Sequence, residues 1–216
     1  QESRGLGDVY KRQPTHNSIP ELMEDIEKFV HNDKLFFPEL LKIALIHYQF
    51  ETIHPFLDGN GRTGRLMITL YLVSRGILKR PILYLSDYLE KHRNSYYTNL
   101  MHVRVDNNII DWFRFFLTGI IETAENGVKT FEEILSLQKE NEDKVKLLGS
   151  RSANALKVLT ELYKRPITDA NMVAGIADIS TASAYTLIAN LEKIGILSEV
   201  TGGKRGRVYI LKKYFD

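Results

Sequence analysis

A run of twelve residues, HPFLDGNGRTGR at positions 54–65, holds a histidine, a carboxylate, two arginines and three glycines. The glycines let the segment Gly59-Asn60-Gly61 adopt backbone conformations that turn several N–H groups toward one point. The helix that we expect to begin near Arg62 adds its unpaired N–H groups and the positive end of its dipole. A turn of this kind before a helix predicts an anion site, and phosphate is the natural ligand.

Four side chains of the same run would complement a bound phosphate. Arg62 and Arg65 lie three residues apart on neighbouring faces of the expected helix, and arginine can bind two phosphate oxygens at once. Asp58 is a hard oxygen ligand suited to the Mg²⁺ that accompanies nucleotide phosphates. His54 is the side chain here whose ordinary pKa suits a general base near neutral pH. Together these residues predict phosphoryl or nucleotidyl transfer, which depends mainly on positioning and electrostatic stabilisation.

The run also has an ordinary structural interpretation. Asp-Gly-Asn-Gly is common turn material, and a His-Pro dipeptide alone indicates no function. We interpret Phe56 as a core anchor that pins the loop, and we assign no role to Leu57 or Thr63. Because all the polar roles fall within twelve positions, a catalytic site explains the run better than a simple turn does.

Helices are expected to position this run, because the chain around it repeats its apolar residues at helical spacing. The segment 38–53 is apolar around much of its surface and is therefore expected to be central. Gly76 would end the helix after the run, and Ser86 would cap the next one. The helices expected in this part are 20–33, 38–53, 62–76, 86–105, 109–124 and 128–148. Since no strand-like run of useful length occurs, about the first 145 residues are predicted to be all-α.

A second pattern follows Gly149-Ser150, where we place a domain boundary. Helices are expected at 151–165, 168–178 and 180–195, the first ended by Pro166 and the last capped by Ser180. Two β-prone runs, 196–200 and 207–211, flank a glycine turn and predict a hairpin. Three helices followed by a hairpin are typical of a winged helix. The predicted fold class is mainly α, with an all-helical domain at 14–148 and a small winged-helix domain at 149–216.

Composition excludes several classes of protein. The chain has 216 residues, 44% hydrophobic and 26% charged, which is ordinary for a globular protein of one or two domains. A net charge of +2 demands no polyanionic partner, and the absence of cysteine excludes disulfides, thiolate catalysis and cysteine metal sites. No apolar run approaches the ~18 residues of a membrane span, and no signal peptide is found, so we expect a cytoplasmic protein without a membrane partner. Residues 1–13 lack helical and strand periodicity, and we interpret them as a non-native leader on a truncated chain.

The run 54–65 resembles the signature of the Fic domain family, His-Pro-Phe-x-(Asp/Glu)-Gly-Asn-Gly-Arg-x-x-Arg, and matches it at every defined position. The helices around it, from PELMEDIEKF to the segment Trp112-Phe113-x-Phe115-Phe116-Leu117, are similar to the all-α core of that family. The resemblance therefore covers about residues 14–148. It implies Mg²⁺-dependent transfer of AMP from ATP to a Ser, Thr or Tyr hydroxyl of a protein, with release of pyrophosphate.

The resemblance also implies a role for each matching residue. His54 would deprotonate the attacking hydroxyl, Asp58 would bind Mg²⁺, and Arg65 would reach the terminal phosphate. Some relatives carry lysine at the position of Gly61 and act as kinases, so Gly61 favours AMP transfer. The residues expected to bind the nucleotide are Gly59, Asn60, Gly61, Arg62, Gly64, Arg65 and Asn99.

This chain departs from the pattern of the family in two features. Many members carry an inhibitory helix with Ser/Thr-x-x-x-Glu-Gly/Asn, whose glutamate pairs with the arginine equivalent to Arg65. The chain offers one weak match, Ser136-Leu-Gln-Lys-Glu140-Asn141, within an expected connector helix. The second feature is a hairpin flap that aligns the target by strand addition, of which Pro14–Ile19 would be the exit.

For several residues outside the run 54–65 we also predict a position in the core, at the surface or beside the nucleotide. Tyr96, Tyr97 and Asn99 lie on the helix that borders the adenine pocket in the family, and core packing is the better interpretation of the two tyrosines. We interpret His47 as a core histidine rather than a metal ligand, and His102 as a surface residue. The residues Phe113, Phe115 and Phe116 are expected in the core.

The function of the winged helix has two interpretations. Lys204, Arg205 and Arg207 on the hairpin could contact DNA phosphates, but the helix 180–195 carries no arginine to recognise guanine. Docking of a protein or of a second copy, giving a homodimer, is therefore favoured over DNA contact, and fold alone does not decide between them. Two alternatives to AMP transfer therefore remain: removal of AMP from a protein at the same site, and a nucleotide-sensing regulator that binds DNA.

Overall fold

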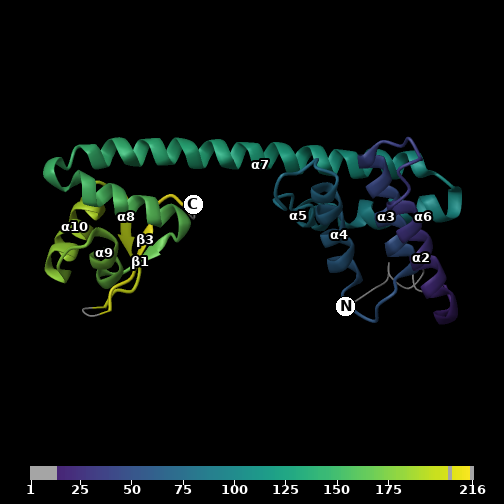
Figure 1. Cartoon of the computed structure of the whole chain (residues 1–216), viewed down its shortest axis with the longest axis horizontal. Coiled ribbons are helices and arrows are strands. Elements are labelled where there is room, and N and C mark those ends of the chain that lie inside the picture. The colour runs from purple at the N-terminus through teal and green to yellow at the C-terminus, as the bar shows by residue number, and fades with distance from the viewer. Residues whose placement is uncertain (1–13, 204–205, 215–216) are drawn as a thin grey trace. The chain divides into compact units, whose positions relative to one another are not determined.

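The structure is a computed structural model that describes residues 14–203 and 206–214. Within these ranges the fold is mainly helical with a small three-stranded sheet, which confirms the predicted fold class. The chain divides into two compact units after Val128, and each is described below by itself (Figure 1). The expected leader, residues 1–13, and the hairpin cations Lys204 and Arg205 lie outside the described residues.

The first unit is built from helices. They are η1 (His16–Ser18), α2 (Ile19–Val30), α3 (Glu39–Ile53), α4 (Asn60–Ser74), α5 (Ser86–Lys91), α6 (Arg93–Asp106) and the first part of α7 (Ile109–Lys146). The stretch expected to leave a hairpin flap, Pro14–Ile19, contains η1 and the first residue of α2. No strand occurs among the described residues of this unit, as the apolar periodicity predicts.

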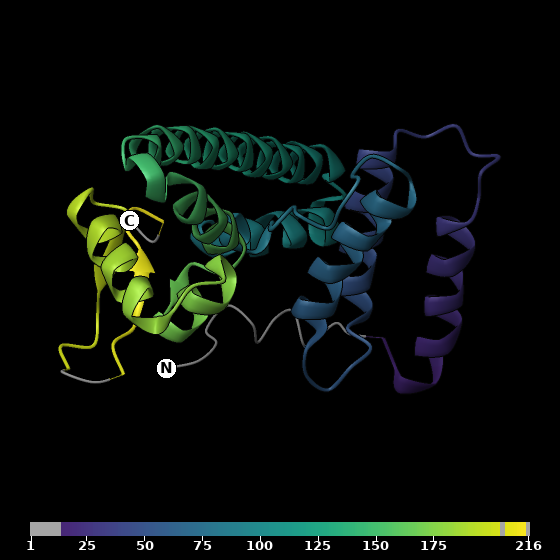
Figure 2. The same cartoon turned by 60° about the vertical axis from the view of Figure 1, so that its left-hand side comes forward.

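Helix α3 is central in the first unit, as its apolar character predicts. Helices α2 and α4 both pack against it, and the three can be followed in Figure 2. The buried Trp112 of α7 donates its Nε1–H to the carbonyl oxygen of Ala44 at 3.0 Å, which fixes α7 to α3. The residues of α3 that are buried are Lys42, Ile43, Ala44, Ile46, His47, Phe50 and Ile53. Phe113, Phe115 and Phe116 pack in the same core, which confirms their predicted role.

The segment 86–105, expected as one helix, forms the two helices α5 and α6. Ser86 is the first residue of α5 and not its cap, since Leu85 occupies the N-cap without a side-chain hydrogen bond. The helix breaks at His92, whose backbone has φ −109° and ψ 30°. The break lets Tyr88 and Leu89 turn into the core, where both are buried. No glycine or proline marks it, so tertiary packing overrides a continuous helical pattern.

The segments 109–124 and 128–148, expected as separate helices, form the single helix α7 (Ile109–Lys146). Gly127 does not interrupt it, because a lone glycine weakens a helix without ending it. The compact units divide within α7, whereas we expected the domain boundary near Gly149. The last turns of α7 belong to the second unit, where Asn141 and Val145 are buried.

The second unit contains three helices and a small sheet. Its elements after α7 are η2 (Gly149–Arg151), α8 (Ser152–Lys164), β1 (Ile167–Thr168), α9 (Ala170–Ala177), α10 (Thr181–Lys193), β2 (Leu197–Glu199) and β3 (Tyr209–Leu211). Ser180 caps α10 as predicted, because its Oγ accepts a hydrogen bond from the Ser183 N–H at 3.2 Å. Asp169 caps α9 in the same way, through the N–H groups of Asn171 and Met172.

Strands β2 and β3 pair antiparallel, which confirms the predicted hairpin. Strand β1, which was not predicted, pairs with the other edge of β3 and gives the order β1-β3-β2. A strand of two residues is too short to show an alternating pattern. The core of this unit joins Leu197, Tyr209 and Leu211 of the sheet to apolar residues of α8, α9 and α10.

Among the described helices, no single one combines the length and the apolar composition needed to cross a membrane. Helices α9 and α10 meet that requirement only when taken together, and they are bent by 102° relative to each other.

Candidate active site

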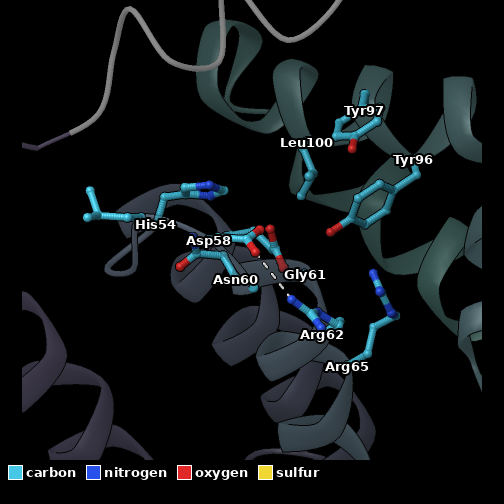
Figure 3. A pocket seen from close by; sticks show the side chains of 12 residues that line it. His54, Asp58, Asn60, Gly61, Arg62, Arg65, Tyr96, Tyr97 and Leu100 are labelled. Atoms are coloured by element: carbon cyan, nitrogen blue, oxygen red, sulfur yellow. Dashed lines mark hydrogen bonds and ion pairs between the residues drawn. The ribbon is translucent and has the colours of Figure 1, made fainter. Parts of the chain in front are cut away.

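The run 54–65 lies at a pocket of about 310 Å³ in the first unit. Its walls are the last turn of α3, the loop that follows, the first turns of α4 and one face of α6 (Figure 3). His54, Asp58, Arg62 and Arg65 all line it, together with the motif residues Gly59, Asn60 and Gly61. The structure thus brings the predicted base, the predicted metal ligand and both predicted phosphate ligands to one pocket.

His54 ends α3 in a left-handed backbone conformation, with φ 53° and ψ 59°. Its N–H still donates to the Phe50 carbonyl oxygen at 2.9 Å, so the residue is fixed to the helix while its ring turns to the pocket. Partial burial lowers the pKa of His54 below its usual 6.5, and a hydrogen bond to the Glu51 backbone opposes this in part. The ring is therefore neutral at neutral pH, as a general base must be.

The loop is held by Asn60 rather than by Phe56. The Asn60 side chain is buried, its Oδ1 accepts from the Phe56 N–H at 2.9 Å, and its Nδ2 donates to the Phe56 carbonyl oxygen at 2.6 Å. Phe56 itself is half exposed, so the expectation that its ring is a core anchor is wrong. The amide of Asn60 therefore organises the loop, and the residue also lines the pocket.

The predicted anion site would lie at Gly59 and the start of α4. Gly59 is the N-cap of α4 with φ 85°, a conformation that favours glycine, and no side chain caps the helix. The first N–H groups of α4 are therefore left for a ligand, at the positive end of the helix dipole. Leu57 beside them is fully exposed, in agreement with its having no assigned role.

The two arginines differ in their surroundings. Arg62 pairs with Asp58 at 3.3 Å between Nη2 and Oδ2, and both side chains are largely exposed. Arg65 is half-buried, forms no ion pair among the described residues, and lies in Figure 3 with its guanidinium on the side of Tyr96. A Cβ at Gly61 would lie 3.0 Å from Arg65 Nη1, so glycine leaves the space that this guanidinium uses.

Gly64 has a role that differs from the expected one. It is buried between α4 and α3 and does not line the pocket. A Cβ at this position would lie 2.7 Å from Glu51 Oε1 and 3.1 Å from His47 Cε1. Gly64 therefore allows close packing of the two helices behind the pocket.

Asn99 is not placed at the pocket. It is half-buried on α6 and donates its Nδ2–H to the Ser95 carbonyl oxygen of the same helix at 2.8 Å. Tyr96 is buried in the core and presents an edge to the pocket, and Tyr97 lines the pocket beside it. His102 is exposed, as expected.

His47 is a core histidine, as expected. Its Nε2 lies 3.0 Å from Tyr96 Oη, and its ring stacks on Trp112 with the planes at 13°. Burial lowers the pKa of His47 to about 4, so the ring is neutral at neutral pH.

Glu51, which the sequence did not single out, lines the pocket from α3. Its Oε1 is buried and has no hydrogen-bond partner among the described residues. Burial raises the pKa of Glu51 to about 7, against the opposing effect of the nearby Arg65 charge. The sequence feature that could have identified Glu51 is its spacing. It lies one helical turn before His54 and one turn after His47, on the face of α3 that carries both.

Glu140, the weak match to an inhibitory glutamate, is engaged within the second unit. Its Oε1 pairs with Lys144 at 2.6 Å and with Lys213 at 3.1 Å. The neighbouring Asn141 is buried and donates to Tyr163 Oη at 2.9 Å. The resemblance of residues 136–141 to the inhibitory motif is therefore explained by packing within the second unit.

On the hairpin, the Arg207 Nε–H donates to the Gly203 carbonyl oxygen at 2.9 Å.

Comparison with known proteins relates the first unit to one family. Residues 2–72 match the model of the Fic/DOC family, a range that begins inside the segment we expected to be a leader. A probable protein adenylyltransferase of Aquifex aeolicus is 41% identical over 61 residues, covering 28% of this chain and 18% of that protein. The protein adenylyltransferase Fic of Drosophila virilis is 35% identical over 126 residues, covering 56% of this chain and 24% of that protein.

A solved structure shares the fold. The crystal structure of a Fic family protein from Desulfovibrio desulfuricans G20 superposes with a TM-score of 0.52 and 20% identity, over 93% of this chain and 57% of that one. At this identity the likeness concerns the fold. The chain spans less than a quarter of the length of the two curated relatives above.

Proposed function

We propose that the chain is a Fic-type adenylyltransferase that transfers AMP from ATP to a hydroxyl group of a protein. The observation that carries the proposal is the convergence in one pocket of His54, the open N-terminus of α4 and the guanidinium of Arg65. A neutral base and a polyphosphate site side by side are what nucleotidyl transfer to a hydroxyl requires. The matches to proteins named adenylyltransferases support the same reaction.

The residues would act in one displacement step. His54 accepts the proton of the target hydroxyl as its oxygen attacks the α-phosphorus of ATP, and the bond to the β,γ-phosphates breaks to release pyrophosphate. The N–H groups at the start of α4 and the Arg62 guanidinium stabilise charge on the phosphates. Arg65, at the far side of the pocket from His54, binds the terminal phosphate and so places the α-phosphorus near the base (Figure 3).

Asp58 fits the Mg²⁺ that the resemblance implies. Magnesium is usually held by one or two carboxylates together with substrate phosphates and water, rather than by a protein cage. Asp58 is a single exposed carboxylate beside the phosphate site, and no group of three or more possible metal ligands occurs among the described residues. Asp58 would hold the ion, which would neutralise phosphate charge when bound.

For the second unit we propose a winged helix. Three helices in the order α8, α9 and α10, followed by the hairpin β2–β3 with β1 on its other edge, support this interpretation. Docking of a protein remains the favoured use of this unit. DNA contact, a homodimer and a cytoplasmic location stay predictions, and the ion pairs of Glu140 give no support to the reverse reaction.

The test is the mass of the products. The chain is incubated with ATP and Mg²⁺, alone and with candidate partner proteins, and intact masses are measured. We expect a gain of one AMP moiety on the chain or on a partner, together with stoichiometric pyrophosphate. A gain of one phosphate instead, with release of ADP, would contradict the proposal.

A further inference from the structure

Glu51 is a carboxyl group in the pocket that the proposed reaction leaves without a role. It faces the pocket from α3, and its Oε1 is buried without a hydrogen-bond partner among the described residues. A buried polar atom of this kind costs stability and is rarely retained without a reason. Its location, between the base on its own helix and Arg65 on the next, makes a role in the site the direct explanation.

The packing around Glu51 leaves its carboxyl group little freedom. The position that a Cβ would take at Gly64 is only 2.7 Å from Oε1, so the α4 backbone closes over this oxygen. On the same side, His47 Nδ1 faces Gly64 without a hydrogen bond of good geometry. Glu51 Oε1 and His47 Nδ1 thus lie against the same point of the α4 backbone, and Arg65 is near enough to act on the charge of the carboxyl group.

The charges that face Glu51 come from three helices. On α3 these are His47 and His54, on α4 Arg65, and on α6 the hydroxyl of Tyr96. Burial keeps His47 neutral because its pKa falls to about 4, and burial holds the pKa of Tyr96 well above 10. Between pH 6 and pH 8 Arg65 is a constant cation. The charge of Glu51 changes within this range, since burial raises the pKa of its carboxyl group to about 7.

We propose that Glu51 is a positioning residue that takes up one proton when a polyphosphate binds beside Arg65. In the ionised state its carboxylate attracts the Arg65 guanidinium and repels phosphate oxygens. In the protonated state it does neither, and its O–H can donate to the ligand or to His47. Uptake of a proton from solvent thus leaves Arg65 directed at the phosphate. The identity of the polyphosphate as ATP rests on the proposed function.

The direction of the pH dependence follows from linkage. A bound polyphosphate adds negative charge next to Glu51 and raises the pKa of its carboxyl group further. Binding and protonation therefore favour each other, so affinity falls as pH rises through neutrality. If the pKa rises by about two units on binding, the affinity for ATP is about tenfold weaker at pH 8 than at pH 6.

The test measures ATP binding by titration calorimetry in EDTA, in pairs of buffers with different ionisation enthalpies. The wild-type chain should take up close to one proton per ATP at pH 8. Glu51→Gln, which keeps the size of the side chain, should take up none at pH 8, where the terminal phosphate of ATP is already ionised. Glu27→Gln removes an exposed carboxylate of α2 outside the pocket and should behave as the wild type.

His54→Ala separates the two titratable groups that share the pocket. It should retain proton uptake at pH 8, because partial burial lowers the pKa of His54. Uptake that persists in Glu51→Gln, or is lost in His54→Ala, would overturn the proposal. Difference infrared spectra of the wild type, which need no variant, should show a protonated carboxyl band on ATP binding at pH 8.

The outcomes also distinguish this proposal from the proposed reaction. Proton uptake through Glu51 without any AMP transfer would support the linkage and contradict the reaction. Failure of both ATP and inorganic tripolyphosphate to bind would contradict the two together. Binding of either without proton uptake would overturn the role of Glu51 and leave AMP transfer to its own test.

Discussion

His54→Ala is expected to lower the rate of AMP transfer by about 10²- to 10⁴-fold while the affinity for ATP stays within about twofold. The loss follows from the role of the imidazole, which accepts the proton of the attacking hydroxyl. Binding is spared because the anion site is formed by the start of α4 and by Arg65, which His54 does not support. The measurement is the rate of AMP incorporation into a partner protein, together with ATP binding by calorimetry.

The role of His54 as the base also predicts how the rate of AMP transfer depends on pH. Because partial burial lowers the pKa of His54 below 6.5, its neutral form persists to lower pH than that of an exposed histidine. The rate of transfer at saturating ATP should therefore fall only as pH drops through that lowered pKa. Transfer by His54→Ala at the wild-type rate, or a rate that rises as pH falls, would contradict its role as the base.

Gly119→Ala is expected to destabilise the first unit by about 1–3 kcal/mol, although alanine favours helices. Gly119 is buried on α7, and a Cβ there would lie 2.6 Å from two ring carbons of Tyr88. That ring is buried and lies against Phe115 with 5.4 Å between ring centroids, so it has no free space to move into. The measurement is the free energy of unfolding in denaturant.

Gly127→Ala in the same helix is the matched control. Among the described residues, no atom outside its own stretch of helix lies within 4 Å of the position that its Cβ would take, so only the helix preference of alanine should act. We expect this variant to gain up to about 1 kcal/mol. Equal effects of the two substitutions would show that α5 does not pack on α7 at Gly119 as the structure has it.

The sequence could predict the site because one short run carries most of its chemistry. The turn at Gly59, the start of α4 and the left-handed end of α3 are local features, and each is encoded by the residues at that place. The burial of Asn60 is different, because its two hydrogen bonds to Phe56 depend on how the loop folds back. The sequence around an asparagine in a turn is the same whether its amide hydrogen-bonds the loop or a ligand, so the sequence could not distinguish these two uses.

What could not be predicted arises from tertiary packing. The break at His92 is set by the burial of Tyr88 and Leu89, and no helix-breaking residue marks it. The close approach of α3 and α4 at Gly64 places Glu51 in the pocket, a relation between positions far apart in the chain. Asn99 lies on the expected helix, but its amide donates to the Ser95 carbonyl oxygen and it is not among the residues that line the pocket. A small error in helix rotation is enough to move a residue from a site to the surface.

The most direct test of AMP transfer uses two samples of ATP, one labelled at its α-phosphorus and the other at its γ-phosphorus. Each is incubated with the chain, Mg²⁺ and a partner protein, beside His54→Ala. We predict label on protein from the α-position alone, and none above background with the variant. Label from the γ-position, or α-label that persists without His54, would contradict the assignment of this pocket as an AMP transfer site.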